Sequence, residues 1–125
     1  MWSSHTKDEL KVTFTDAVSN HNSQCFIKYH NNTPVGFALC SLRRDYVEGT
    51  SSSPVGYLEG IFVEDDFRGR RFAAELLKAC ESWAKSLGCT EFASDCELQN
   101  QNSLRFHFAT GFEEAGRIIC FRKDI

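Results

Sequence analysis

Residues 55–87 constrain the fold of this chain more than any other stretch, because an apolar run, a charged loop and an amphipathic segment follow one another directly. The apolar run Val55–Val63 is rich in β-branched and aromatic residues and has the length of a buried strand. From Phe72 to Leu87 the apolar residues recur at intervals of three and four, which predicts one buried face of a helix. The sequence therefore predicts a strand that leads through a short loop into a helix.

The loop before the predicted helix is basic and contains one glycine, in the order Arg68-Gly69-Arg70-Arg71-Phe72-Ala73. Free backbone N–H groups and the positive end of the helix dipole meet at such a point, which favours an anion such as a phosphate. The loop contains neither the Gly-Lys-Ser/Thr of a Walker A loop nor the G-x-G-x-x-G of a dinucleotide-binding turn. A basic loop before a helix is more often an ordinary solvated cap, so the loop alone leaves its function open.

The loop resembles the acetyl-CoA loop of the GNAT acetyltransferases, whose pattern is Gln/Arg-x-x-Gly-x-Gly/Ala. Arg68 and Ala73 match the first and sixth positions, whereas Arg71 stands where the family has glycine. Longer segments are similar to one branch of that family, the aminoglycoside 6′-N-acetyltransferases. These segments are residues 44–49, 52–55, 57–63, 83–85, 89–95 and 111–114. The resemblance extends from about Trp2 to the C-terminus.

The resemblance implies an α/β fold, the GNAT acyl-CoA N-acyltransferase fold, with a mixed central sheet in a single domain over residues 1–125. Domains of this family open with a strand and a helix before the position that matches Trp2. The resemblance therefore implies that this chain lacks that first strand and helix. Such a sheet is expected to have an unpaired edge at residues 24–30 or at the neighbouring strand, which needs a partner or a cover.

The pattern of apolar and turn residues predicts the remaining elements. Strands are expected at residues 24–30, 35–43, 90–95 and 113–123, and helices at 2–18 and 102–110. The first helix is predicted from Leu10, Phe14 and Val18, which recur at intervals of four. Gly88 and Gly111 are expected to end the two later helices.

The family resemblance implies acetyl transfer from acetyl-CoA to a primary amine, the 6′-amino group of an aminoglycoside. Two alternatives stay open. One is a GNAT enzyme for a polyamine or peptide amine, and the other is a degenerate domain that binds CoA without catalysis. Arg71 and the absent first strand motivate the second alternative.

The resemblance also implies where acetyl-CoA binds. The pyrophosphate is expected at residues 68–73, and the pantetheine along the backbone of Ile61, Phe62 and Val63. Asn100 and Ser103 are expected beside the pantetheine. His107 occupies the position of the family's tyrosine acid, and its imidazolium could protonate the departing thiolate. A hydrogen-bonded helix histidine is the equally open alternative.

Two carboxylates are candidates for the amine site, and Glu59 could contact the substrate amine or act as a base through a water molecule. Glu59 lies inside an apolar strand, where a carboxylate is costly unless it is paired or faces a cleft, so a structural ion pair with an arginine is its alternative. Asp95 ends the next strand, where open α/β sheets place ligands, and a turn cap is its alternative. The resemblance makes Asp95 a candidate base and adds Tyr46, Trp2 and His5 to the substrate wall.

Composition excludes several classes of function. A net charge of −3 argues against nucleic-acid binding and suits a cationic substrate. No apolar run reaches the roughly 18 residues of a membrane span, and no signal peptide is visible, so we expect a cytoplasmic protein. The six cysteines form no C-x-x-C pair, which predicts reduced thiols and no metal site. The predicted free edge, together with the family's usual assembly, predicts a homodimer in which residues 2–18 reach the neighbour.

Overall fold

The structure, a computed structural model, describes residues 8–13 and 22–125 of the chain. The elements follow one another in the order β1 (Asp8–Thr13), β2 (Ser23–His30), β3 (Thr33–Arg43), β4 (Val55–Val63), a 3₁₀ turn (Asp65–Phe67), α1 (Phe72–Ser86), β5 (Phe92–Ala93) and α2 (Gln101–Ala109). The predicted strand at 55–63 and the predicted helix after the basic loop are confirmed. None of the helices in the described part of the chain has the length and apolar character that a membrane span requires.

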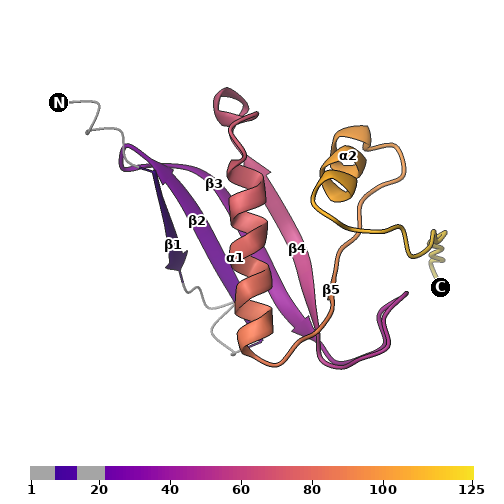
Figure 1. Cartoon of the computed structure of the whole chain (residues 1–125). Helices are drawn as coiled ribbons and strands as arrows, with labels where there is room; N and C mark the ends of the chain where they lie inside the picture. The colour runs from indigo at the N-terminus through magenta and orange to yellow at the C-terminus, as the bar shows by residue number, and fades with distance from the viewer. Residues whose placement is uncertain (1–7, 14–21) are drawn as a thin grey trace.

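The five strands form one sheet in the order β1-β2-β3-β4-β5. Neighbouring strands are antiparallel except β4 and β5, which are parallel, so the predicted mixed sheet is confirmed. Helix α1 supplies the crossover between these two strands and lies across one face of the sheet (Figure 1). Helix α2 stands beyond β5, away from α1 (Figure 1).

The core lies between α1 and the sheet face that it covers. Leu76 is fully buried at its centre, in line with the three-four spacing that predicted the helix. The other buried members of this cluster are Phe26, Val35, Ala38, Cys40, Leu58, Val63, Phe72, Leu77 and Cys80. A side chain at Gly36 would come within 2.8 Å of the Phe62 carbonyl oxygen, so β3 and β4 need glycine there to pack closely.

A β-bulge interrupts the ladder between β3 and β4. Leu39 pairs with Gly60 and Cys40 pairs with Leu58, so Glu59 has no residue opposite it. A bulge shifts the alternation of faces by one residue. Leu58 and Val63, five positions apart, can therefore both face α1, and Glu59 sits at the position where the strand changes face.

The first predicted helix is wrong where it can be examined. Residues Asp8–Thr13 form β1, which pairs antiparallel with β2, and the rest of segment 2–18 lies outside the described residues. Leu10 and Val12 alternate with charged neighbours, and this two-residue period outweighs the spacing of four. Because β1 pairs along residues 25–30, the placement of the unpaired edge at 24–30 is wrong, and among the described strands the neighbouring β1 is the outermost on that side.

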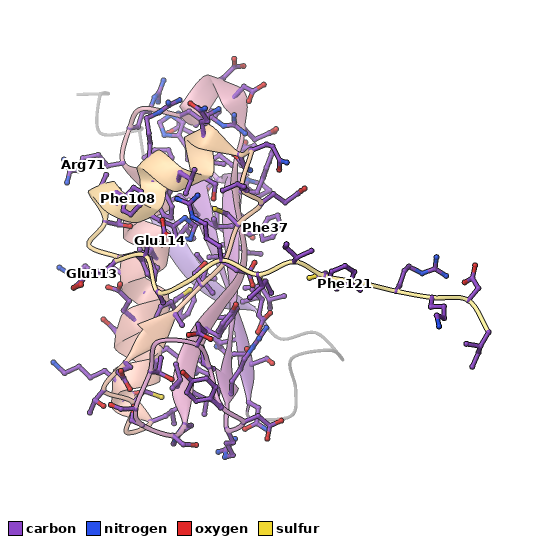
Figure 2. All side chains as sticks on the ribbon, turned by 90° about the vertical axis from the view of Figure 1, so that its right-hand side faces the viewer. Phe37, Arg71, Phe108, Glu113, Glu114 and Phe121 are labelled. Carbon is purple, nitrogen blue, oxygen red and sulfur yellow. The ribbon has the colours of Figure 1, made fainter. Side chains whose placement is uncertain are left out.

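The last predicted strand is wrong as well, and the one before it is shorter than predicted. Strand β5 has two residues in place of the six expected at 90–95. Residues 112–125 form no strand, and Ile119 and Phe121 expose 80% and 89% of their surface. Figure 2 shows the chain after Glu114 running away from the body, with Phe121 on the extended part. A strand needs a neighbour to pair with, and the short β5 offers this segment too little edge.

Candidate active site

Strands β4 and β5 separate soon after they meet. They pair only at Gly56–Phe92 and Tyr57–Ala93 within the described chain, whereas β4 continues to Val63 with β3 on its other side. The two ribbons diverge from their contact in Figure 1. The predicted pantetheine residues, Ile61, Phe62 and Val63, lie on this diverging part of β4. One of their carbonyls is already used, because Arg68 Nε donates to the Val63 oxygen at 2.9 Å.

The basic loop contains two residues with a left-handed backbone directly before α1. Arg71, the N-cap residue of α1, is left-handed with φ 67° and ψ 16°, and Gly69 has φ 83°. A non-glycine residue in this region costs about 1–2 kcal/mol. Arg71 therefore adopts a conformation that glycine reaches without this cost, and α1 begins directly after it. The Arg71 side chain points away from the body (Figure 2).

The other two arginines of the loop are held by local contacts. Arg68 Nη1 lies 3.0 Å from the Asp65 carboxylate, and its guanidinium lies 5.9 Å from the Phe62 ring centre. Arg70 lies 4.9 Å from the centre of the Phe67 ring. A hollow of about 540 Å³ lined by Phe62, Arg68 and residues 64–67 adjoins this loop.

A larger open cavity, of about 770 Å³, lies between β4, β5, α2 and the loop at residues 46–50. Three of the predicted site residues line it together: Tyr46, Asp95 and His107. Glu59 is not among its lining residues, and Trp2 and His5 lie outside the described residues. Residues 110–118 form a further wall of the cavity. A side chain at Gly49 would come within 2.5 Å of the Ala115 Cβ atom, so the loop and this wall pack closely.

Glu59 forms the structural ion pair that was its alternative interpretation. Arg43 Nη2 donates to Oε1 at 2.8 Å and Nε donates to Oε2 at 3.1 Å, so the guanidinium and the carboxylate form a bidentate ion pair. The Ser41 hydroxyl donates to the same carboxylate. The charge of Glu59 is therefore matched locally, and its role as a base stays a prediction.

Asp95 makes a contact that the sequence did not predict. The Tyr57 hydroxyl donates a hydrogen bond to Asp95 Oδ2. Burial, followed by this bond to Asp95, raises the pKa of Tyr57 to about 12, so the phenol stays protonated at neutral pH. The guanidinium carbon of Arg43 lies 3.5 Å from the centre of the Tyr57 ring. The only sequence signal for Tyr57 was a hydroxyl within an apolar strand, two residues before Glu59.

His107 is hydrogen-bonded at both ring nitrogens. Nδ1 lies 2.7 Å from the Ser103 carbonyl oxygen, which can only accept, so Nδ1 carries a proton. In the neutral ring Nε2 then accepts from the Ser94 hydroxyl at 2.8 Å. Asn100 caps α2 by accepting from the Ser103 N–H at 3.0 Å. The structure thus shows the hydrogen-bonded histidine that was the alternative, and the acid role stays a prediction.

The loop that carries Tyr46 is tied down at its far end. Glu91 accepts from the N–H groups of Ser51 and Ser52 at 3.0 and 2.9 Å. Hydrogen bonds from the Ser52 hydroxyl and the Ser51 N–H lower the pKa of Glu91. Tyr46 itself exposes 76% of its surface and accepts from the Gly49 N–H at 3.3 Å.

The six cysteines are free thiols, three of them buried. Across the part of the chain that the structure describes, no group of three or more His, Cys, Asp and Glu side chains could hold a metal ion.

Comparison with known proteins places these features in a family. The model of the acetyltransferase (GNAT) family matches residues 1–112. The aminoglycoside N(6')-acetyltransferase type 1 of Salmonella typhimurium is 40% identical over 123 residues, which cover 98% of this chain and 85% of that protein. The enzyme of the same name from Acinetobacter baumannii is 38% identical over 125 residues, which cover 100% of this chain and 86% of that protein.

Solved structures agree with this assignment. The aminoglycoside N-acetyltransferase AAC(6')-Iy in complex with CoA superimposes with a TM-score of 0.89 at 32% identity, covering 96% of this chain and 97% of that one. The same enzyme in complex with a bisubstrate analogue, CoA-S-monomethyl-acetylneamine, superimposes with a TM-score of 0.80 at 44% identity. The match covers 83% of this chain and 71% of that one.

Proposed function

Because this chain belongs to the acetyltransferase (GNAT) family and is similar over most of its length to aminoglycoside N(6')-acetyltransferases, we propose that it transfers an acetyl group from acetyl-CoA to the 6′-amino group of an aminoglycoside. The observation that carries the proposal is the diverging pair β4 and β5 beside a cavity that Asp95 lines. The amine nitrogen forms the bond to the acetyl carbon as the carbon–sulfur bond breaks. In our proposal Asp95 takes the amine proton, and His107 is the candidate donor to the thiolate.

The residues present fit acetyl-CoA. Gly69 and Arg71 have left-handed backbones and the helix begins at Phe72, so its first N–H groups are unpaired by the helix itself, and Arg68, Arg70 and Arg71 precede this point in the sequence. An anionic pyrophosphate is stabilised by those groups and by the helix dipole. The backbone of Ile61 and Phe62 on β4 would then pair with the amide-rich pantetheine.

The charge of the cavity supports a polycationic amine. Its acidic lining residues are Glu48, Glu81, Glu91, Asp95, Glu113 and Glu114. The lining arginines are both paired, Arg43 with Glu59 and Arg117 with Glu114 at 2.9 Å. The excess of carboxylates favours an aminoglycoside over a singly charged peptide amine.

Turnover of acetyl-CoA with kanamycin, tobramycin and spermidine, compared side by side, tests this proposal. We expect the two aminoglycosides to be acetylated with the higher kcat/KM. A preference for spermidine would favour a polyamine enzyme. Binding of CoA without turnover of any amine would instead support the degenerate domain. An enzyme that consumes acetyl-CoA must reach the acetyl-CoA pool of the cell, and we propose the cytoplasm as its location.

Replacing Arg68 with alanine is expected to weaken CoA binding about tenfold, because the pyrophosphate loses a charged partner worth about 1.4 kcal/mol. Isothermal calorimetry measures this directly. Arg105→Ala, on α2, is the matched control, because Arg105 is an exposed arginine outside the loop. Unchanged affinity in Arg68→Ala would contradict the assignment of the pyrophosphate site and make Arg71 the next residue to test.

We also propose that the enzyme is a homodimer. The predicted free edge at β2 does not support it, since β1 covers that edge. The support comes from the extended segment after Gly116, where Ile118, Ile119 and Phe121 expose 79–89% of their surface. Apolar side chains this exposed are stabilised by a second chain. The cavity wall at residues 110–118 continues into this segment, so each cleft would lie beside the dimer contact.

Light scattering at micromolar concentration is expected to give twice the chain mass of 14.2 kDa. Ile119→Asp should shift the mass toward the monomer, because a carboxylate cannot be buried unpaired in an apolar contact. Lys123→Gln, in the same segment, changes the net charge by the same single unit and is the control. A wild-type monomer with full activity would contradict the dimer.

A further inference from the structure

A continuous chain of four side chains connects the two candidate carboxylates. Glu59 binds Arg43, the Arg43 guanidinium stacks on the Tyr57 ring, and the Tyr57 hydroxyl donates to Asp95. These residues come from the end of β3, from β4 and from the segment directly after β5.

The four connected side chains differ in how far their charges are compensated. Arg43 and Glu59 compensate each other through two nitrogen–oxygen contacts of 2.8 and 3.1 Å. Tyr57 is neutral at the pH of the reaction, since its pKa is raised to about 12. Asp95, which lines the cavity, accepts a hydrogen bond from the neutral Tyr57 hydroxyl, while the Arg43 guanidinium that acts on its charge is itself paired with Glu59.

Tyr57 is held far more firmly than Asp95. Its backbone lies in register with Ser41 of β3 on one side and Ala93 of β5 on the other, at the last position where β4 has both neighbours. Its side chain is 7% exposed and packed beneath the Arg43 guanidinium. Asp95 lies beyond the two-residue β5 and is exposed.

We propose that Tyr57 is a positioning residue for acetyl transfer, whose hydroxyl fixes Asp95 at Oδ2 and so orients the carboxylate toward the substrate amine. This inference rests on the proposed function. A carboxylate that must meet an amine in one geometry gains rate when its rotamer is fixed beforehand. Arg43 supports the same geometry one step further away, because it holds the ring that carries the hydroxyl.

Tyr57→Phe tests the inference, because it keeps the ring and its contact with Arg43 and removes only the hydroxyl. We expect kcat with an aminoglycoside to fall about tenfold, equivalent to about 1.4 kcal/mol of barrier. The KM for acetyl-CoA should stay unchanged, which a general loss of structure would not allow. Tyr29→Phe on β2, outside the cavity lining, is the matched control and should leave kcat unchanged.

A double-mutant cycle with Asp95→Asn decides whether the hydroxyl acts through Asp95. We expect Tyr57→Phe to have no further effect on kcat in the Asp95→Asn background. Equal tenfold losses in both backgrounds, or an unchanged kcat in Tyr57→Phe alone, would overturn the positioning role. If the wild-type protein acetylates no amine, the proposed function fails. A cycle of Tyr57→Phe with Asp95→Ala, which removes the accepting oxygen, measured on the free energy of unfolding then tests the Tyr57–Asp95 link, and zero coupling there overturns it.

Discussion

Replacing Asp95 with asparagine is expected to lower kcat by about 100-fold or more while leaving the fold and CoA affinity intact. The substitution keeps the shape of the side chain and its ability to accept from Tyr57, but removes the negative charge beside the cavity. Without that charge residue 95 cannot take the amine proton, while the other carboxylates of the cavity remain to attract a cationic substrate. Steady-state kinetics at saturating acetyl-CoA measure the loss, and calorimetry with CoA checks the cofactor site.

Glu97→Gln is the matched control for this substitution. Glu97 is an exposed carboxylate two residues further along the same loop, and it does not line the cavity. Removal of its charge should leave kcat within about twofold, in the range of ordinary surface substitutions. A decrease of less than about tenfold in Asp95→Asn, roughly 1.4 kcal/mol of barrier, would show that Asp95 is not a main catalytic group.

Replacing Leu76 with alanine is expected to lower the free energy of unfolding by about 3 kcal/mol, because it leaves a cavity in a packed interior. Leu76 is fully buried, and a side chain added at Gly36 would lie 3.4 Å from its Cδ1 atom, so it fills the space directly above β3. Helix α1 would lose its central contact with the sheet. Urea denaturation followed by circular dichroism measures the change.

Leu98→Ala supplies the comparison for this core substitution. Leu98 exposes 58% of its surface in the loop before α2, so the same truncation removes little buried area there. Its effect on the free energy of unfolding should stay within about 0.5 kcal/mol. A loss of less than about 1 kcal/mol in Leu76→Ala would contradict the packing of α1 against the sheet.

The sequence predicted the site less completely than the fold. Tyr46, Asp95 and His107, three of the residues that it proposed for the site, line one cavity, and their roles stay predictions. It left two interpretations of Glu59 open, and the structure shows the ion pair, because Arg43 lies on the neighbouring strand next to the bulge. It missed Tyr57 entirely. A contact between residues 38 positions apart has no local pattern, and only the pairing of β4 with β5 creates it.

The basic loop shows a different limit of sequence patterns. A family pattern with glycine in the fourth position made Arg71 a doubtful residue, yet Arg71 adopts the left-handed backbone that glycine would supply. The position of a turn is set by the elements that it joins, here β4 and α1. The residue at this position changes the free energy of the turn by about 1–2 kcal/mol, and the backbone conformation stays left-handed.

Local periodicity by itself determined where β4 and α1 begin and end, because both elements are buried in this core and their apolar spacing is set by that burial. It could not decide the two ends of the chain. Residues 8–13 pair as a strand because β2 offers them a neighbour, and residues 113–123 carry a strand-like sequence without one. Strand formation depends on hydrogen bonds to another segment, whereas a helix makes its own. The tertiary structure therefore decided which apolar segments join the sheet, and with them where Asp95 meets Tyr57.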